Sequence, residues 1–235
     1  MKRHLTATLF TLLLAAAAAG QQERAGGKQG SQTPPDTMTV VAPRQLPSEY
    51  GKLEGGTYTN DFFGFSMSVK PGWVAVDAAT RKRLMDTGKA VMGEGVPERK
   101  MQALENSMTR LDFLLNVSKF DVDRPGPDFN AMLMCMAERV PSAVIKSERE
   151  YIAVSMKVVN EMAAKTELTA PIRTQMIGEV AFTVADMKLT AGPRLVAQRY
   201  YVKLLKGYAL VMVYSYVDEE DLQAIDEMMK TVRFK

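Results

Sequence analysis

The stretch LVAQRYYVKLLKGYALVMVYSYV, residues 195–217, decides the fold of this chain. Lys206 and Gly207 stand between two runs that are rich in β-branched and aromatic residues, and a two-residue connection of this kind closes a β-hairpin. We therefore predict two antiparallel strands, over residues 195–205 and 208–217.

One face of this hairpin is aromatic and basic. Counting outward from the turn places Arg199 opposite Tyr214 and Tyr201 opposite Met212, with Tyr216 farther along the same face. Arg199 beside the tyrosines would hold an anion or a ring-shaped ligand by charge and stacking. In the alternative, a helix covers this face and the tyrosines serve packing. The candidate binding residues are Arg199, Tyr201, Tyr214 and Tyr216.

The hairpin is expected to have a strand before it and a helix after it. Residues 180–190 are predicted to form a third strand. Asp218 is predicted to cap a final helix, and residues 231–234 to form a short closing strand. The inward side chains of that helix are Leu222, Ile225 and Met229.

The domain opens with a half-buried strand, in which apolar side chains alternate with small and polar ones. The apolar side chains are Phe63, Phe65, Met67 and Val69. Asn60 and Asp61 favour a turn that pairs this strand with residues 57–59, and Pro71 ends it.

The middle of the chain is predicted to mix strands and helices. Residues 111–117 have the period of a strand, which puts Leu111, Phe113, Leu115 and Val117 on one face. Helices are expected after Asp77, from Pro97, from Asp128 (with Phe129, Met132, Met136 and Val140 on one face) and from a capping box of Ser147 and Glu150. The predicted class is α+β, an antiparallel β-sheet flanked by helices.

Both ends of the domain carry motifs. Residues 60–73 read NDFFGFSMSVKPGW, and residues 207–214 read GYALVMVY before an acid-capped helix and a closing strand that ends Val-Arg-Phe. The first motif resembles the opening strand of PsbP-like and DcrB-like domains, and the second is similar to that family's final strand, helix and strand. The middle of the chain resembles the family only in the order of its elements.

The resemblance implies an α/β/α sandwich built on an antiparallel sheet. Members of the family include extrinsic subunits of the photosynthetic water-oxidising complex, bacterial envelope lipoproteins and a nuclear GTPase-binding protein. The resemblance therefore implies non-enzymatic binding, although a fold does not set a function. No functional residue is carried over, because the chain lacks the lipoprotein cysteine and a histidine metal ligand.

The first residues have the pattern of a cleavable secretory signal. A basic tip at residues 2–4 precedes an apolar run from Leu5 to Ala19, and small and polar residues follow. We expect residues 1–20 to be removed by cleavage after Ala19 or Gly20. The run is shorter than the roughly 20 residues that span a bilayer.

The mature chain is predicted to be a spacer followed by one domain. Residues 21–49 are rich in Gln, Gly, Pro, Ser and Thr, which is typical of a flexible segment. Residues 50–235 have a globular composition and suit one core. Since no cysteine stands at the cleavage point, we expect a soluble secreted or periplasmic protein with no integral membrane segment.

Composition excludes several chemistries. Without the signal, 28 basic side chains stand against 27 acidic ones, so nucleic acid and acidic membranes are not expected as partners. The single histidine, His4, lies in the signal, which excludes Ser-His-Asp and Cys-His nucleophiles and removes the commonest metal ligand. Cys135, the single cysteine, is expected to be a buried thiol. We expect no cofactor.

Two stretches match metal sites in part. Asp121 opens a sequence like a calcium loop, but Met132 stands where a bidentate glutamate belongs. The sulfurs of Met132, Met134, Cys135 and Met136 are of the soft kind that copper prefers. On the predicted helix, neighbours two residues apart would point to different faces. We therefore assign no metal ligand.

Two functions of different classes remain open. The first is a non-catalytic accessory or binding module that docks a protein partner or a small ligand outside the cytosol. The second is a hydrolase with a carboxylate or Ser-Lys site that only the fold assembles. That hydrolase would need a cleft with two facing carboxylates of shifted pKa. We predict the first function and assign no catalytic residue.

Overall fold

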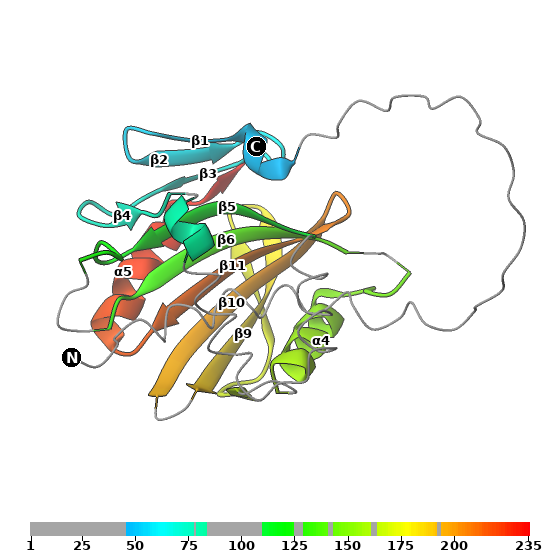
Figure 1. Cartoon of the computed structure of the whole chain (residues 1–235). Coiled ribbons are helices and arrows are strands. Elements are labelled where there is room, and N and C mark those ends of the chain that lie inside the picture. The colour runs from blue at the N-terminus through cyan, green and yellow to red at the C-terminus, as the bar shows by residue number, and fades with distance from the viewer. Residues whose placement is uncertain are drawn as a thin grey trace, which may run out of the picture.

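The computed structural model describes residues 46–77, 79–83, 110–124, 129–140, 143–160, 164–191 and 194–235. These parts of the chain are built mainly of strands (Figure 1). Residues 79–83 are helical, as predicted after Asp77. The predicted signal, most of the predicted spacer and the helix predicted from Pro97 lie outside the described residues. Within the described residues, no helix is long and apolar enough to cross a membrane.

The first elements form a small four-stranded sheet with the last strand of the chain. A 3-10 helix, η1 (Pro47–Tyr50), leads into the strands β1 (Gly51–Glu54), β2 (Thr57–Asn60) and β3 (Phe65–Ser68), and β12 (Arg233–Phe234) lies beside β3. All neighbours are antiparallel. The predicted strand around Phe65 and its pairing with residues 57–59 are confirmed, whereas β1 was not predicted.

A second sheet of eight strands carries most of the core. Its order is β4-β5-β6-β11-β10-β9-β7, with β8 beside β9, and every pair is antiparallel. Its strands are β4 (Val74–Ala75), β5 (Leu111–Ser118), β6 (Met132–Arg139), β7 (Ala164–Leu168), β8 (Arg173–Ile177), β9 (Val180–Ala191), β10 (Arg194–Leu205) and β11 (Tyr208–Tyr216). With the helices α4 (Glu148–Asn160) and α5 (Glu219–Lys230), these strands confirm the predicted α+β class.

The β10–β11 hairpin has the turn and the register that the sequence predicts. Arg199 pairs with Tyr214, as counted from the turn. Lys206 has a φ of 55° and Gly207 a φ of 81°, which is the pair of left-handed residues that a two-residue hairpin requires. The turn therefore fixes which side chains of the two strands share a face.

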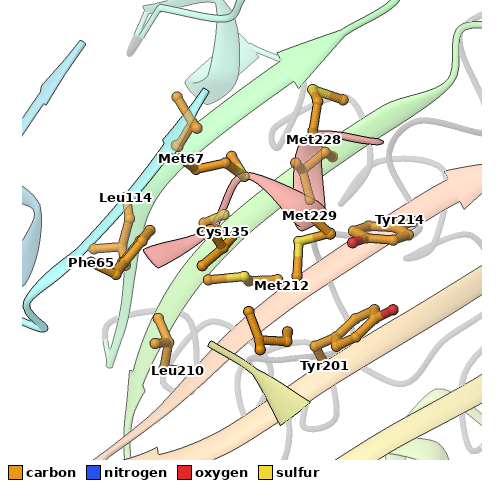
Figure 2. Packing of buried hydrophobic residues seen from close by; sticks show 14 of the residues in the cluster. Phe65, Met67, Leu114, Cys135, Tyr201, Leu210, Met212, Tyr214, Met228 and Met229 are labelled. Carbon is orange, nitrogen blue, oxygen red and sulfur yellow. The ribbon is translucent and has the colours of Figure 1, made fainter. Parts of the chain in front are cut away.

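Other elements pack on both faces of the large sheet. On one face, Tyr151 and Ile152 of α4 join the buried side chains of the sheet. On the other face, Met228 and Met229 of α5 pack with side chains of the small sheet (Figure 2). The layers are therefore α4, the large sheet, and α5 together with the small sheet. The sequence pattern did not separate the two sheets.

The helix predicted from Asp128 is wrong, because residues 132–139 form the strand β6. Met132, Met134 and Met136 face α4, and Cys135 faces α5. All four side chains are fully buried. A strand buried on both faces is a continuous apolar run without alternation, and methionine has good helix propensity. Pairing with β5 and β11 on either side overrides that propensity.

A bulge in β5 changes the predicted faces of that strand. The register shifts between Phe113 and Leu115, so Leu114 is an extra residue on this strand. Before the bulge, Leu111 and Phe113 pack on the α4 side, and after it Leu115 and Val117 pack on the α5 side. The prediction that these four side chains share one face is therefore wrong.

Ser147 and Asp218 cap their helices as predicted, but the second bond of the predicted capping box comes from Lys146 and not from Ser147. The backbone N–H of Glu150 donates to Ser147 Oγ at 3.2 Å, and the backbone N–H of Lys146 donates to Glu150 Oε2 at 2.9 Å. At α5, the backbone N–H of Asp221 donates to Asp218 Oδ1 at 2.8 Å. These bonds satisfy N–H groups that have no partner inside the helix.

Candidate functional site

The four predicted binding residues share one face of the sheet, and α5 covers much of it. Tyr201 is 1% exposed and Tyr214 is 0% exposed, and their ring centroids lie 5.4 Å apart. Figure 2 shows Met229 of α5 next to Tyr214. For these two residues the alternative holds, in which a helix covers the face and the tyrosines serve packing. Tyr216 is half-buried at the margin of the covered area.

Arg199 is held by two carboxylates of its own chain. Its Nε donates to Asp186 Oδ1 at 2.5 Å, and its Nη1 donates to Asp226 Oδ1 of α5 at 3.2 Å. Arg173 of β8 donates from Nη1 to Asp186 Oδ2 at 2.5 Å. Two arginines and two aspartates balance one another, and the network joins α5 and β8 to the sheet. The two carboxylates already neutralise the guanidinium, which weakens its attraction for an added anion.

The two packed tyrosines remain neutral. Burial raises the pKa of Tyr201, and it raises the pKa of Tyr214 well above its ordinary value. Tyr201 Oη donates to Gln175 Oε1 at 3.4 Å, whereas Tyr214 Oη has no hydrogen-bond partner among the described residues. A phenol with a raised pKa is a poor general base at neutral pH, so neither tyrosine is suited to that role.

Beyond α5, no element of the described residues covers the same face of the sheet, and Figure 1 shows β9 and β10 reaching past this helix. We call this area the open platform. Leu195 on it is 55% exposed, and Tyr216 forms its border toward α5. The open platform consists of Lys165 and Glu167 of β7, Lys188 and Thr190 of β9, Leu195 and Ala197 of β10, and Tyr216 of β11.

Register shows that these side chains point to one side. One row across the strands is Lys165, Thr190 and Leu195. The next row is Glu167, Lys188, Ala197 and Tyr216. Paired residues share a face, and every second residue along a strand returns to it. The intervening side chains are buried on the α4 side, among them Thr166, Leu189, Val196 and Gln198.

The platform combines apolar and charged side chains. Lys165 Nζ and Glu167 Oε1 lie 2.7 Å apart in an exposed ion pair, which contributes little to stability because solvent screens it. Lys188 stands opposite Glu167 and is exposed. An exposed leucine and a half-buried tyrosine therefore lie within a charged margin, which is how many protein interfaces are composed.

The aspartates of the sequence that resembles a calcium loop form an ion pair and a hydrogen bond within the protein. Asp123 pairs with Arg83 Nη2 at 2.5 Å, and Asp121 Oδ1 accepts a hydrogen bond from the backbone N–H of Asp123 at 2.9 Å. Residues 125–128 of this stretch lie outside the described residues. Across the part of the chain that the structure describes, no three His, Cys, Asp or Glu side chains gather as metal ligands would.

Copper binding by the methionines of β6 was excluded on the geometry of a predicted helix, but these residues lie on a strand. Met132, Met134 and Met136 share a face because β6 is a strand, so the exclusion of copper on helix geometry is wrong. These side chains are fully buried and pack among aliphatic and aromatic residues of the α4 side. Methionine commonly fills irregular apolar space in this way.

The open platform was not predicted because the strand β7 was not predicted. Lys165 and Glu167 are exposed and flank the buried Thr166, which is the alternation of a half-buried strand. Five residues carry little periodic signal, and only the pairing of β7 with β9 brings them beside Lys188 and Leu195. Tyr216 is the one predicted binding residue that belongs to the open platform.

Comparison with known proteins gives a likeness of fold. No family model and no curated protein matches the chain. Among solved structures, it is similar to the solution structure of cyanobacterial PsbP (CyanoP) from Synechocystis sp. PCC 6803, with 11% sequence identity and a TM-score of 0.47 over 84% of this chain and 99% of that chain. This likeness concerns the fold and extends to no ligand or partner.

Proposed function

We propose that this protein is an exported, non-catalytic accessory module that docks a protein partner on the open platform. The observation that carries the proposal is the exposed Leu195, 55% accessible, beside the half-buried Tyr216 on a sheet face that no described element covers. Apolar side chains inside a charged margin are typical of a docking surface. The predicted signal and spacer support a role outside the cytosol, with the domain held on a flexible segment.

The hydrolase alternative has no specific observation in its favour. Burial raises the pKa of Glu138 and of Asp221, but the two carboxyls lie on opposite sides of the large sheet. Glu138 accepts a hydrogen bond from Tyr151 of α4, whereas Asp221 belongs to α5 and pairs with Lys119 at 2.7 Å. They do not face each other across a cleft, which a paired-carboxylate mechanism requires.

Capture from the exported fraction tests the proposal. The immobilised chain is compared with Leu195→Asp and with Met176→Asp, a control on β8 where Met176 is 57% exposed. We expect a saturable complex with the wild type and the control, and at least tenfold weaker binding by Leu195→Asp, because a buried unpaired charge opposes docking. Equal binding by all three proteins would contradict a docking surface at Leu195.

Melting temperatures separate a protein partner from a small ligand. A ligand that binds only the folded state raises the melting temperature in proportion to its affinity. We expect no shift with a panel of metal ions, sugars, lipids and peptidoglycan fragments. A saturable shift that Arg199→Ala abolishes would contradict the protein-docking proposal and favour a small ligand at the predicted site.

A further inference from the structure

A carboxyl and a phenol are buried together between β6 and α4. Tyr151 Oη donates to Glu138 Oε2 at 2.6 Å. Glu138 is 0% exposed and Tyr151 is 2% exposed. The second carboxyl oxygen, Oε1, has no hydrogen-bond partner among the described residues. The pair lies on the opposite side of the sheet from the open platform, so protein docking does not explain it.

The surroundings of this pair are mostly apolar. On the neighbouring strands, Glu138 stands opposite Leu111 of β5 and Ala209 of β11. No ion pair of Glu138 occurs within the part of the chain that the structure describes. Among the described residues, the charged and titratable groups that act on the pair are Arg110 before β5 and Tyr200 of β10. Glu148, three residues before Tyr151 on α4, pairs with Lys203 of β10 at 3.6 Å.

An ionised carboxylate is unfavourable in this place. Burial raises the pKa of Glu138 to about 8, and the bond from Tyr151 and the charge of Arg110 offset this effect only in part. Glu138 therefore keeps its proton at neutral pH. Loss of the proton to solvent leaves a negative charge in an apolar layer, where it is far less favourable than in water.

We infer that Glu138 and Tyr151 form a proton-dependent latch that holds α4 on the large sheet. With the proton in place, a neutral hydrogen-bonded pair fits the buried layer between helix and sheet. When the carboxyl ionises, opening of α4 lets water reach the charge, so the open state gains stability relative to the closed one. The latch is independent of the open platform, because the two lie on different faces.

The sign of the pH dependence follows from the direction of the pKa shift. In the closed state the pKa of Glu138 is about 8, above its ordinary value of 4.5. The closed state therefore binds the proton more tightly than the open state does. The stabilisation is complete below the ordinary value, is lost progressively as the pH rises toward about 8, and changes no further above that.

Hydrogen exchange of the α4 amides in the full chain tests the latch. After correction for intrinsic exchange rates, the opening constant of wild-type α4 is expected to rise by up to about tenfold per pH unit between about pH 5 and about pH 8. Glu138→Gln should abolish this dependence. Glu167→Gln, which changes an exposed carboxyl on β7, should keep it. A flat wild-type profile, or a wild-type slope in Glu138→Gln, would overturn the inference.

A measurement on the unaltered chain covers the case in which Glu138→Gln does not fold. The infrared carbonyl band of a protonated, buried carboxyl should be present at neutral pH and should disappear above about pH 8. Disappearance of the band together with faster exchange of the α4 amides supports the latch. Absence of the band at neutral pH overturns it.

Discussion

Arg199 of β10 and Asp226 of α5 lie 3.2 Å apart and form an ion pair from the sheet to the helix that covers it. The same guanidinium binds Asp186 of β9 at 2.5 Å. Only 17% of the Arg199 side chain is exposed, so water screens these contacts less than it screens a surface pair. Arg199 therefore connects two layers of the fold.

Arg199→Ala should lower the free energy of unfolding by about 2 to 3 kcal/mol, because Asp226 loses its donor and Asp186 loses one of two. Urea denaturation measures this change. Lys165→Ala is the matched control: it removes an exposed, solvent-screened ion pair with Glu167 and should lower the free energy of unfolding much less than Arg199→Ala does. Equal losses in the two variants would show that the network adds no more than a surface pair does.

The sequence predicts the face of Arg199 correctly but not what covers that face. Lys206 and Gly207 fix the register of the hairpin, because a two-residue turn leaves no freedom in the pairing. The face alone does not reveal its cover, since α5 could pack on either side of the sheet. Asp226, the partner from α5, is separated from Arg199 by 27 residues, and no local pattern links the two.

Strand β6 shows why the middle of the chain was harder to predict. Met132 to Met136 are buried on both faces, so the alternation that marks a half-buried strand is absent. In β5, the extra residue Leu114 reverses the alternation partway along the strand. Both features depend on pairing between strands that are distant in sequence, which periodicity within one segment does not record.

Asp218→Ala should destabilise the chain by about 1 kcal/mol through loss of the cap of α5. Asp218 Oδ1 accepts from the backbone N–H of Asp221 at 2.8 Å, and an alanine cannot replace that acceptor. Asp218→Asn should stay within a few tenths of a kcal/mol of the wild type, because asparagine caps helices about as well as aspartate. Chemical denaturation of the three proteins measures the difference in stability. A large loss of stability in Asp218→Asn would show that the negative charge of Asp218, and not its capping hydrogen bond, stabilises α5.

Cys135 should react with thiol reagents only after the chain unfolds. It is 0% exposed on the α5 side of β6, and burial raises the pKa of its thiol to about 12. The thiolate is the reactive form, so both access and chemistry protect the side chain. The labelling rate should be low in native buffer. With added denaturant it should rise in step with the unfolded fraction. Rapid labelling in native buffer, at the rate of the denatured chain, would contradict this burial.

Asn60 makes three hydrogen bonds in the first turn of the domain, and one of them joins this turn to η1. Its Nδ2 donates to the carbonyl oxygen of Pro47 at 2.9 Å and to Tyr58 Oη at 3.1 Å, and its Oδ1 accepts from the backbone N–H of Phe63 at 3.0 Å. The side chain is 1% exposed. The sequence indicated the turn at Asn60 and Asp61, but the contact with η1 depends on tertiary structure.

Asn60→Ala should lower the free energy of unfolding by about 2 to 4 kcal/mol, because buried partners of all three bonds are left unsatisfied. Asp61→Ala is the neighbouring control: Asp61 is exposed, and its replacement should change stability by no more than about 0.5 kcal/mol. Urea denaturation compares the two variants, and hydrogen exchange shows where the loss acts. Faster exchange at residues 57–68 in Asn60→Ala would follow from a loosened turn, since β2 and β3 meet there. A loss confined to the large sheet would contradict the role assigned to Asn60.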